Sequence, residues 1–297
     1  MLPRRIAFLA LLGGATGIGF APILVRLSET GLVATGFFRI LFALPVLWIW
    51  MLLEDRGRLT ALPRSQLETG TGSAPHLIFV AAGLFFAGDL AFWHWSIRLT
   101  TVANSTFITN FAPLVVMVGA RLLFRERITP ALVLGMALAV LGGALMVSAS
   151  LKIELSHVLG DFLALVTALF YGAYLLAVKY LRRTFSPATI MAWSGLVTCP
   201  ALLLIALASH ETILATTWKG WLVLLTLALV SHVAGQGLIA YAAAHLSAAF
   251  LSVSLLFQPA VAAVLAWVIL GESLSVIQIA GGTVILCGII VASRSDR

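Results

Sequence analysis

Residues 111–142 read FAPLVVMVGARLLFRERITPALVLGMALAVLG, and residues 257–288 read FQPAVAAVLAWVILGESLSVIQIAGGTVILCG. The two stretches align without a gap at an offset of 146 residues, and the similarity extends over residues 100–147 and 246–293. Identical pairs include Phe111 and Phe257, Pro113 and Pro259, Glu126 and Glu272, Gly135 and Gly281, and Gly142 and Gly288. An internal repeat in a very apolar chain is typical of membrane proteins built from two related halves.

The composition is that of a membrane protein. Of the 297 residues, 61% are apolar and 10% are charged, whereas soluble domains carry roughly 25% charged residues. A helix needs about 20 apolar residues to cross the hydrocarbon core of a bilayer. Ten stretches of this kind are centred near residues 16, 42, 87, 111, 139, 169, 197, 229, 257 and 284. The sequence therefore predicts an all-α polytopic membrane protein with ten transmembrane helices and no soluble domain.

Basic residues fall mostly on one side of the predicted membrane. The side of the amino terminus carries thirteen of them: Arg4, Arg5, Arg56, Arg58, Arg64, Arg121, Arg125, Arg127, Lys179, Arg182, Arg183, Arg294 and Arg297. The opposite side carries four: Arg26, Arg98, Lys152 and Lys219. This bias predicts that both termini are cytoplasmic. The basic excess is expected to set orientation and to contact lipid headgroups, and it does not indicate nucleic-acid binding.

The repeat divides the chain into residues 1–150 and 151–297, with five predicted helices in each half. Because five is an odd number, the second half enters the membrane from the opposite face, which predicts an inverted repeat. Near the start of each half the offset is 153 residues, and it aligns Gly19 and Arg26 with Gly172 and Lys179. The polar stretch 54–75 supplies the extra residues of the first half and is predicted to be a flexible cytoplasmic connection.

Glycines that share one face of a helix, and prolines at repeated positions, are interpreted as residues for helix packing and for bending. Small residues let helices approach closely in lipid. On this basis we expect helix packing at Gly13, Gly17, Gly135, Gly142, Gly281 and Gly288. Pro113 and Pro259 lie in the middle of the fourth and ninth predicted helices, where each removes a backbone hydrogen bond. They are interpreted either as fixed kinks or as paired hinges, one for each side of the membrane.

Arg39 and Asp89 are the clearest charges inside the predicted spans. At about 1.5 Å per residue, both lie roughly 12–13 Å below the outer ends of their helices, so the sequence predicts an intramembrane ion pair. A charge in mid-membrane is costly and should face protein or water. The pair is either structural or takes part in handling a ligand or a proton.

Polar and aromatic residues recur near the same depth, and apolar walls with a few polar groups are typical of a small-molecule cavity. The candidate cavity residues are Phe86, Asp89, Trp93, His94, Asn110, Tyr171, Tyr174, His232, Gln236, Phe257 and Gln258. Taken singly, Trp93 is also compatible with an interfacial aromatic belt, and His232 with a bond to a neighbouring carbonyl. No phosphate-binding loop, metal-ligand cluster or nucleophile–base set is present in the sequence. We therefore expect no ATP use, no metal or other cofactor, and no catalytic residues.

The pattern Pro113…Glu126…Gly135…Gly142 with its repeat Pro259…Glu272…Gly281…Gly288, in a chain of ten predicted helices, resembles the EamA-type branch of the drug/metabolite transporter superfamily. The resemblance covers essentially the whole chain. It implies a multi-pass protein of the bacterial inner membrane that exports amino acids, related metabolites or toxic compounds. The aromatic set is compatible with the aromatic amino-acid exporters of the family, because flat rings and cation–π contacts suit such ligands.

The resemblance implies a secondary transporter or facilitator that moves a small-molecule substrate by alternating access, and a monomer is feasible. Asp89, His94 and His232 are the groups that could take up a proton if transport is coupled. Alternatives within transport are an importer or a sugar-conjugate carrier of the same fold. From another class, the alternatives are a membrane-embedded enzyme or a non-transporting partner subunit.

Overall fold

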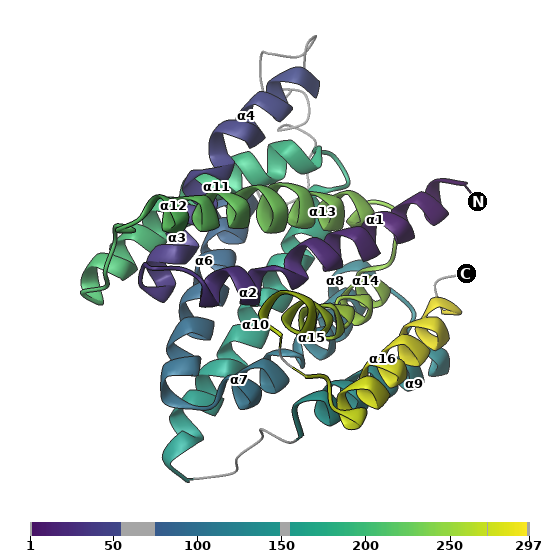
Figure 1. Cartoon of the computed structure of the whole chain (residues 1–297). Coiled ribbons are helices and arrows are strands. Elements are labelled where there is room, and N and C mark those ends of the chain that lie inside the picture. The colour runs from purple at the N-terminus through teal and green to yellow at the C-terminus, as the bar shows by residue number, and fades with distance from the viewer. Residues whose placement is uncertain (1, 55–74, 149–154, 272, 296–297) are drawn as a thin grey trace.

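The computed structural model describes residues 2–54, 75–148, 155–271 and 273–295, and all regular elements in these ranges are helices. The expected loop at 54–75 and the repeat residue Glu272 fall almost entirely outside the described residues. Within the described ranges, ten helical segments are long and apolar enough to cross a membrane, as the sequence predicts. Figure 1 shows them packed into one bundle.

The first five spans are built from eight helices. They are α1 (Leu2–Gly19) with α2 (Ala21–Arg26), α3 (Leu32–Leu41) with α4 (Ala43–Glu54), α6 (Pro75–Leu99), α7 (Val102–Thr109) with α8 (Ala112–Phe124), and α9 (Pro130–Val147). The second five use the 3-10 turn η2 (Leu155–His157) with α10 (Val158–Leu181), α11 (Pro187–Ala208), α12 (Trp218–Thr226) with the π-helix η3 (Leu227–Gln236) and α13 (Gly237–Ala243), α14 (Ala248–Ser254) with α15 (Phe257–Leu270), and α16 (Val276–Ser293).

The packing of these helices repeats between the halves. Helix α6 packs on α10, just as the corresponding segment η3–α13 packs on α1. Helix α8 contacts α10, just as α15 contacts α1, and α9 pairs with its own repeat equivalent α16. A Cβ atom on Gly19 would lie 2.7 Å from Val261, and one on Gly172 would lie 2.8 Å from Val115. Because Val115 and Val261 are themselves 146 residues apart, the two contacts are repeat equivalents, as a pseudo-twofold axis requires.

Four of the six glycines expected to pack lie at the crossing of α9 and α16. Cβ atoms on Gly135, Gly142, Gly281 and Gly288 would each lie 2.5–2.6 Å from a backbone carbonyl oxygen of the other helix. In α1, Gly17 lies against Gly235, but Gly13 has ordinary van der Waals room, with its nearest neighbour at 3.5 Å. The close approach falls instead on Gly14, where a Cβ would lie 2.7 Å from the Gly235 carbonyl oxygen.

The two prolines lie in the first turn of a new helix rather than inside a continuous one. Helix α7 ends at Thr109 before α8 brings in Pro113, and α14 ends at Ser254 before α15 brings in Pro259. The first helical turn tolerates proline because its N–H groups have no intrahelical partner. Both spans are therefore broken at corresponding places, just before each proline.

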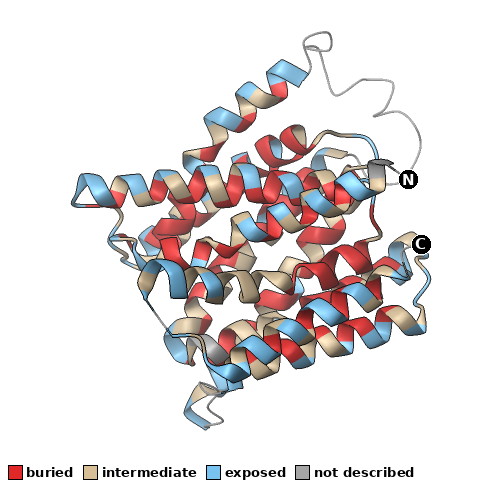
Figure 2. Cartoon of the chain, turned by 45° about the vertical axis from the view of Figure 1, so that its right-hand side comes forward, coloured by how far each residue is buried: buried red, intermediate tan, exposed pale blue. Residues whose placement is uncertain are grey.

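Apolar residues cover the outside as well as the inside of the bundle. Figure 2 shows buried residues running through the centre while exposed residues follow the outward faces of the helices. Large exposed side chains on these faces include Leu9, Leu122, Val268 and Ile290. Because soluble proteins rarely expose large contiguous apolar patches, these faces fit a lipid environment.

Candidate functional site

Phe86 is the centre of a group of aromatic rings contributed by three spans. Its ring stacks on that of Tyr174 from α10, with centroids 4.7 Å apart and planes 28° apart. On η3, His232 also stacks against Phe86 at 5.5 Å and 26°. The ring of Tyr171 continues the group at 6.4 Å from Tyr174. We call these four residues the aromatic cluster; both repeats contribute to it.

Arg39 places a positive charge over this cluster. Its guanidinium carbon lies 5.8 Å from the centroid of the Phe86 ring, which is the geometry of a cation–π contact. Arg39 is buried, and its Nε has no hydrogen-bond partner. Asp89, one helical turn beyond Phe86, is half-buried and within electrostatic range of Arg39. The structure gives Arg39 and Asp89 an electrostatic interaction rather than a direct salt bridge.

Two glutamines connect the cluster to neighbouring helices. Gln236 of η3 lies within interaction range of Tyr174, and Gln258 of α15 lies within interaction range of Tyr171. Each glutamine has one polar atom buried without a partner, Oε1 of Gln236 and Nε2 of Gln258. Side chains from the eighth and ninth spans thus adjoin the tyrosines of α10.

Unpartnered buried polar atoms are concentrated among the candidate residues. Over nine-tenths of buried polar groups in proteins are normally hydrogen-bonded. Here the unpartnered atoms in the spans are Arg39 Nε, His94 Nδ1, Thr109 Oγ1, Asn110 Nδ2, His232 Nδ1, Gln236 Oε1 and Gln258 Nε2. Water or a polar ligand would satisfy such groups. Thr109 is a member of this set that the sequence reasoning missed.

The remaining candidates lie apart from the aromatic cluster. His94 is buried and packs near Gly36 of α3, one turn before Arg39, while its neighbour Trp93 is half-buried. Asn110 points toward α9, where its Nδ2 is 3.6 Å from the place of a Cβ on Gly143. Phe257, at the start of α15, packs against the main apolar core. The structure thus joins Phe86, Asp89, Tyr171, Tyr174, His232, Gln236 and Gln258 with Arg39. It also places His94 within electrostatic range of Arg39, and it leaves Trp93, Asn110 and Phe257 at the margin.

His232 and Gln236 lie on a π-helix of ten residues, Leu227–Gln236. In a π-helix each backbone hydrogen bond spans one more residue than in an α-helix. Such segments occur frequently at functional sites. Close packing with α1 accompanies it, since Gly235 on η3 and Gly14 on α1 meet backbone to backbone. No residue pattern in the sequence signals this widened turn.

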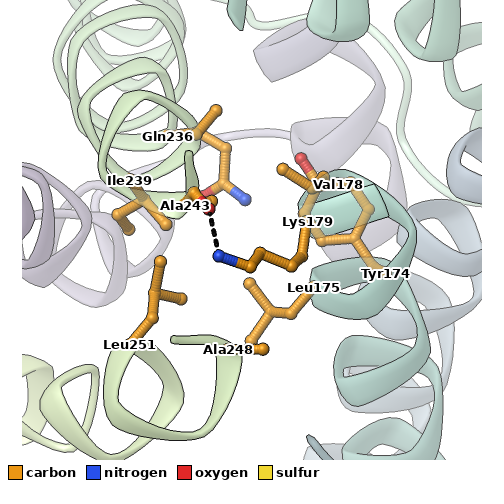
Figure 3. Close-up of a pocket in the computed structure, with 10 residues that line it drawn as sticks. Tyr174, Leu175, Val178, Lys179, Gln236, Ile239, Ala243, Ala248 and Leu251 are labelled. Atoms are coloured by element: carbon orange, nitrogen blue, oxygen red, sulfur yellow. Dashed lines mark hydrogen bonds between the residues drawn. The ribbon is translucent and has the colours of Figure 1, made fainter. Parts of the chain in front are cut away.

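A small cavity opens beside Tyr174 and Gln236, and Figure 3 shows the side chains around it. Its volume is about 10 Å³, which is room for one water molecule. Lys179 extends along the cavity, and its Nζ donates to the Ala243 carbonyl oxygen at 2.8 Å and to that of Leu246. Little free volume therefore remains beside Tyr174 and Gln236.

Comparisons with known proteins identify the family and the fold of the chain. The model of the EamA-like transporter family matches the chain twice, over residues 5–148 and 158–294. The chain belongs to the EamA-like transporter family. One crystal structure of a protein has the same fold: it is 18% identical, covers 99% of both chains and superposes with a TM-score of 0.78. No curated protein matches the sequence.

Family membership confirms the resemblance found in the sequence, together with the fold of ten apolar helices in two repeated halves. It identifies a multi-pass membrane protein of the drug/metabolite transporter type, whose family consists of transporters rather than enzymes. The site described above lies among helices of both repeats.

Proposed function

We propose that this EamA-like protein is a secondary transporter or facilitator that exports neutral amino acids, including aromatic ones, across a bacterial inner membrane. The observation that carries the proposal is the aromatic cluster with Arg39 and Asp89 beside it. An amino acid offers two charged groups and a side chain, and the site offers a cation, an anion and aromatic surfaces. Apolar walls with few polar groups suit a small solute.

Alternating access needs an end that closes and opens, and charged side chains hold one end of this bundle. Glu126, at the end of the fourth span, accepts N–H bonds from Ala248 at 2.9 Å and from Ala249 at 3.2 Å. Lys179 binds carbonyl oxygens just before this point, at Ala243 and Leu246. Lys179 thus binds the first part of the turn between α13 and α14, and Glu126 binds its end. We call this arrangement the turn latch.

In this proposal the turn latch and both termini lie on the cytoplasmic side, and the excess of basic residues on that side supports this orientation. Release of the latch would free the first half of the ninth span, α14, to move about the break before Pro259. The corresponding break before Pro113 gives the fourth span the same freedom. This supports the hinge interpretation of the two prolines, since helix breaks at matched positions of the repeats allow each side to move separately.

Flux through the purified protein tests the function. Proteoliposomes containing only this chain should show saturable movement of labelled phenylalanine, tryptophan or threonine down a gradient, and empty vesicles should not. An imposed pH gradient separates proton-coupled export from facilitation. Saturable uptake of a sugar conjugate alone would support the alternative carrier. A correctly folded chain that moves no solute would refute the proposal and favour the partner-subunit or enzyme alternatives.

A further inference from the structure

Resting on the proposed function, we infer that Arg39 and Asp89 form a divided ion pair that holds a zwitterionic α-amino acid, Arg39 binding its carboxylate and Asp89 its ammonium group. The two side chains come from α3 and α6, and neither belongs to the part of the sequence that repeats. They would thus determine substrate class rather than movement.

Arg39 is buried and lacks a hydrogen-bond partner at its Nε. A charge at this depth is costly and is normally compensated by a direct, often bidentate partner. Arg39 has instead the face of Phe86 at 5.8 Å and an unpartnered Nε. Its guanidinium therefore keeps planar donor capacity within a buried site. A carboxylate matches that fork of donors in shape and charge.

Asp89 lies one helical turn from Phe86, the residue that Arg39 covers. Phe86 and Asp89 are three residues apart on α6 and therefore lie on the same face of the helix. Arg39 sits over the first of these two residues, and it interacts electrostatically with the second without forming a salt bridge among the described residues. Asp89 is also half-buried, whereas Phe86 and Arg39 are buried. The ammonium group of an amino acid could therefore bind Asp89 while the carboxylate of the same molecule binds Arg39.

The groups around Arg39 and Asp89 are polar and aromatic side chains without a formal charge of their own. Tyr171 and Tyr174 lie within electrostatic range of both Arg39 and Asp89. His232 stacks on Phe86 beside the pair, and its Nδ1 is unpartnered. A net-neutral ligand leaves the combined charge of Arg39 and Asp89 balanced, whereas a ligand with only one charge leaves an uncompensated charge in the membrane interior.

Three related compounds separate the two anchors. L-Phenylalanine has both charges, 2-phenylethylamine lacks the carboxylate, and 3-phenylpropionate lacks the amine. The measurement is equilibrium binding of labelled phenylalanine to the purified full chain, with each compound as competitor. For the wild-type chain, we expect phenylalanine to compete at concentrations at least about tenfold below those of the other two, as expected for loss of one charged hydrogen-bonded partner.

Two substitutions should change this order in opposite directions. Arg39→Gln should weaken phenylalanine about 10- to 100-fold and leave 2-phenylethylamine nearly unchanged. Asp89→Asn should weaken phenylalanine by a similar factor and leave 3-phenylpropionate nearly unchanged. Arg39→Lys keeps the charge without the planar fork and should fall between wild type and Arg39→Gln. Equal losses for all three compounds in both variants would overturn the inference.

The double variant Arg39→Gln with Asp89→Asn guards against a folding defect, because it removes both charges together. If it folds, as judged by its elution and unfolding midpoint, and no longer distinguishes the three compounds, the inference is supported. If Arg39→Gln, Asp89→Asn and the double variant all unfold, the pair is structural and the inference is wrong. A wild-type chain that binds and moves other solutes but no amino acid refutes the proposed substrate class itself. Selective phenylalanine transport that is insensitive to both substitutions refutes only the divided ion pair.

Discussion

Gly135 on α9 and Gly288 on α16 meet backbone to backbone: a Cβ atom on either would lie 2.5 Å from the other's carbonyl oxygen. Gly142 and Gly281 meet in the same way further along the two helices. The repeat aligns Gly135 with Gly281 and Gly142 with Gly288. Gly135 therefore contacts the equivalent of Gly142, and Gly142 contacts the equivalent of Gly135. A twofold axis between the two helices requires this exchange.

Alanine at this crossing should destabilise the protein. In Gly135→Ala the new methyl group would collide with backbone, which cannot rotate away, and we expect a loss of about 1–3 kcal/mol. The measurement is the midpoint of thermal unfolding of the purified protein in detergent. Gly282→Ala on α16 is the matched control, because its Cβ would have its nearest neighbour at 3.7 Å. Equal midpoints for both variants would contradict the crossing described here.

Neighbouring glycines of α1 should behave differently from each other. Gly14→Ala would press against the carbonyl oxygen of Gly235 at 2.7 Å and against Ile239 at 2.8 Å, whereas Gly13→Ala has 3.5 Å of room. Because η3 carries His232 and Gln236, displacement of α1 from η3 should lower the transport rate as well as the unfolding midpoint. Flux in proteoliposomes checks this. Gly13→Ala should retain wild-type flux, and a larger loss in Gly13→Ala than in Gly14→Ala would show that the facing residue has been misassigned.

The spans and the repeat were predictable from the sequence because they depend on apolar length and on spacing along the chain. Which side chains meet across helices was less so. Asn110 and Gln258 each precede a repeated proline, yet only Gln258 lies within interaction range of Tyr171. At the offset of 153, Ile18 stands at the place equivalent to Tyr171 and offers no hydroxyl. The repeat therefore predicts the helix break before each proline, but it does not predict which polar side chain lies beside it.

The π-helix marks a second limit of prediction. Sequence spacing places His232 and Gln236 one α-helical turn apart, but the backbone at Leu227–Gln236 is wider than an α-helix. Its close contact with α1 depends on Gly14 facing Gly235, a tertiary relationship that a one-dimensional pattern does not contain. The depths of Arg39 and Asp89 were inferred from helix rise alone, whereas the absence of a direct salt bridge between them depends on how α3 packs near α6.

Removal of the Glu126 carboxylate should open the end that the turn latch closes. Glu126→Gln removes the charged carboxylate that accepts hydrogen bonds from the N–H groups of Ala248 and Ala249. Charge-assisted hydrogen bonds of this kind are worth about 1.5–3 kcal/mol. We expect a cysteine placed at Ala240, which is buried and lines the small cavity, to react at least about tenfold faster with a polar maleimide. The background is a chain in which Cys199 and Cys287 are replaced by serine.

Arg127→Gln controls for a change of surface charge near the latch, because Arg127 is exposed and lies one position after Glu126. Its labelling rate at position 240 should equal that of the parent. If Glu126→Gln also leaves the rate unchanged while the protein stays folded, the latch does not govern access to the cavity, and the gating part of the proposal fails.

Glu29 should make stability pH-dependent in acid. In the connection between α2 and α3, its carboxylate accepts bonds from the hydroxyl and backbone N–H of Thr217 and from those of Thr216. These bonds, that of the Thr217 hydroxyl first, lower the pKa of Glu29 from 4.5 to about 2. A lowered pKa in the folded state stabilises the protein above the unfolded-state pKa. This contribution should disappear as the pH falls from 4.5 toward about 2.

Two variants separate this titration from the capping role of Thr217, whose side chain also accepts the Gly220 N–H at the start of α12. Glu29→Gln should flatten the decline of the unfolding midpoint in this pH window and leave the cap intact. Thr217→Val should reduce the decline by raising the pKa of Glu29, and should lower stability by about 0.5–2 kcal/mol at every pH through loss of the cap. Because Glu29 is exposed, the titration effect should be small and should weaken in high salt. An unfolding midpoint that falls equally steeply with acid in wild type and Glu29→Gln would assign the acid sensitivity to other carboxylates.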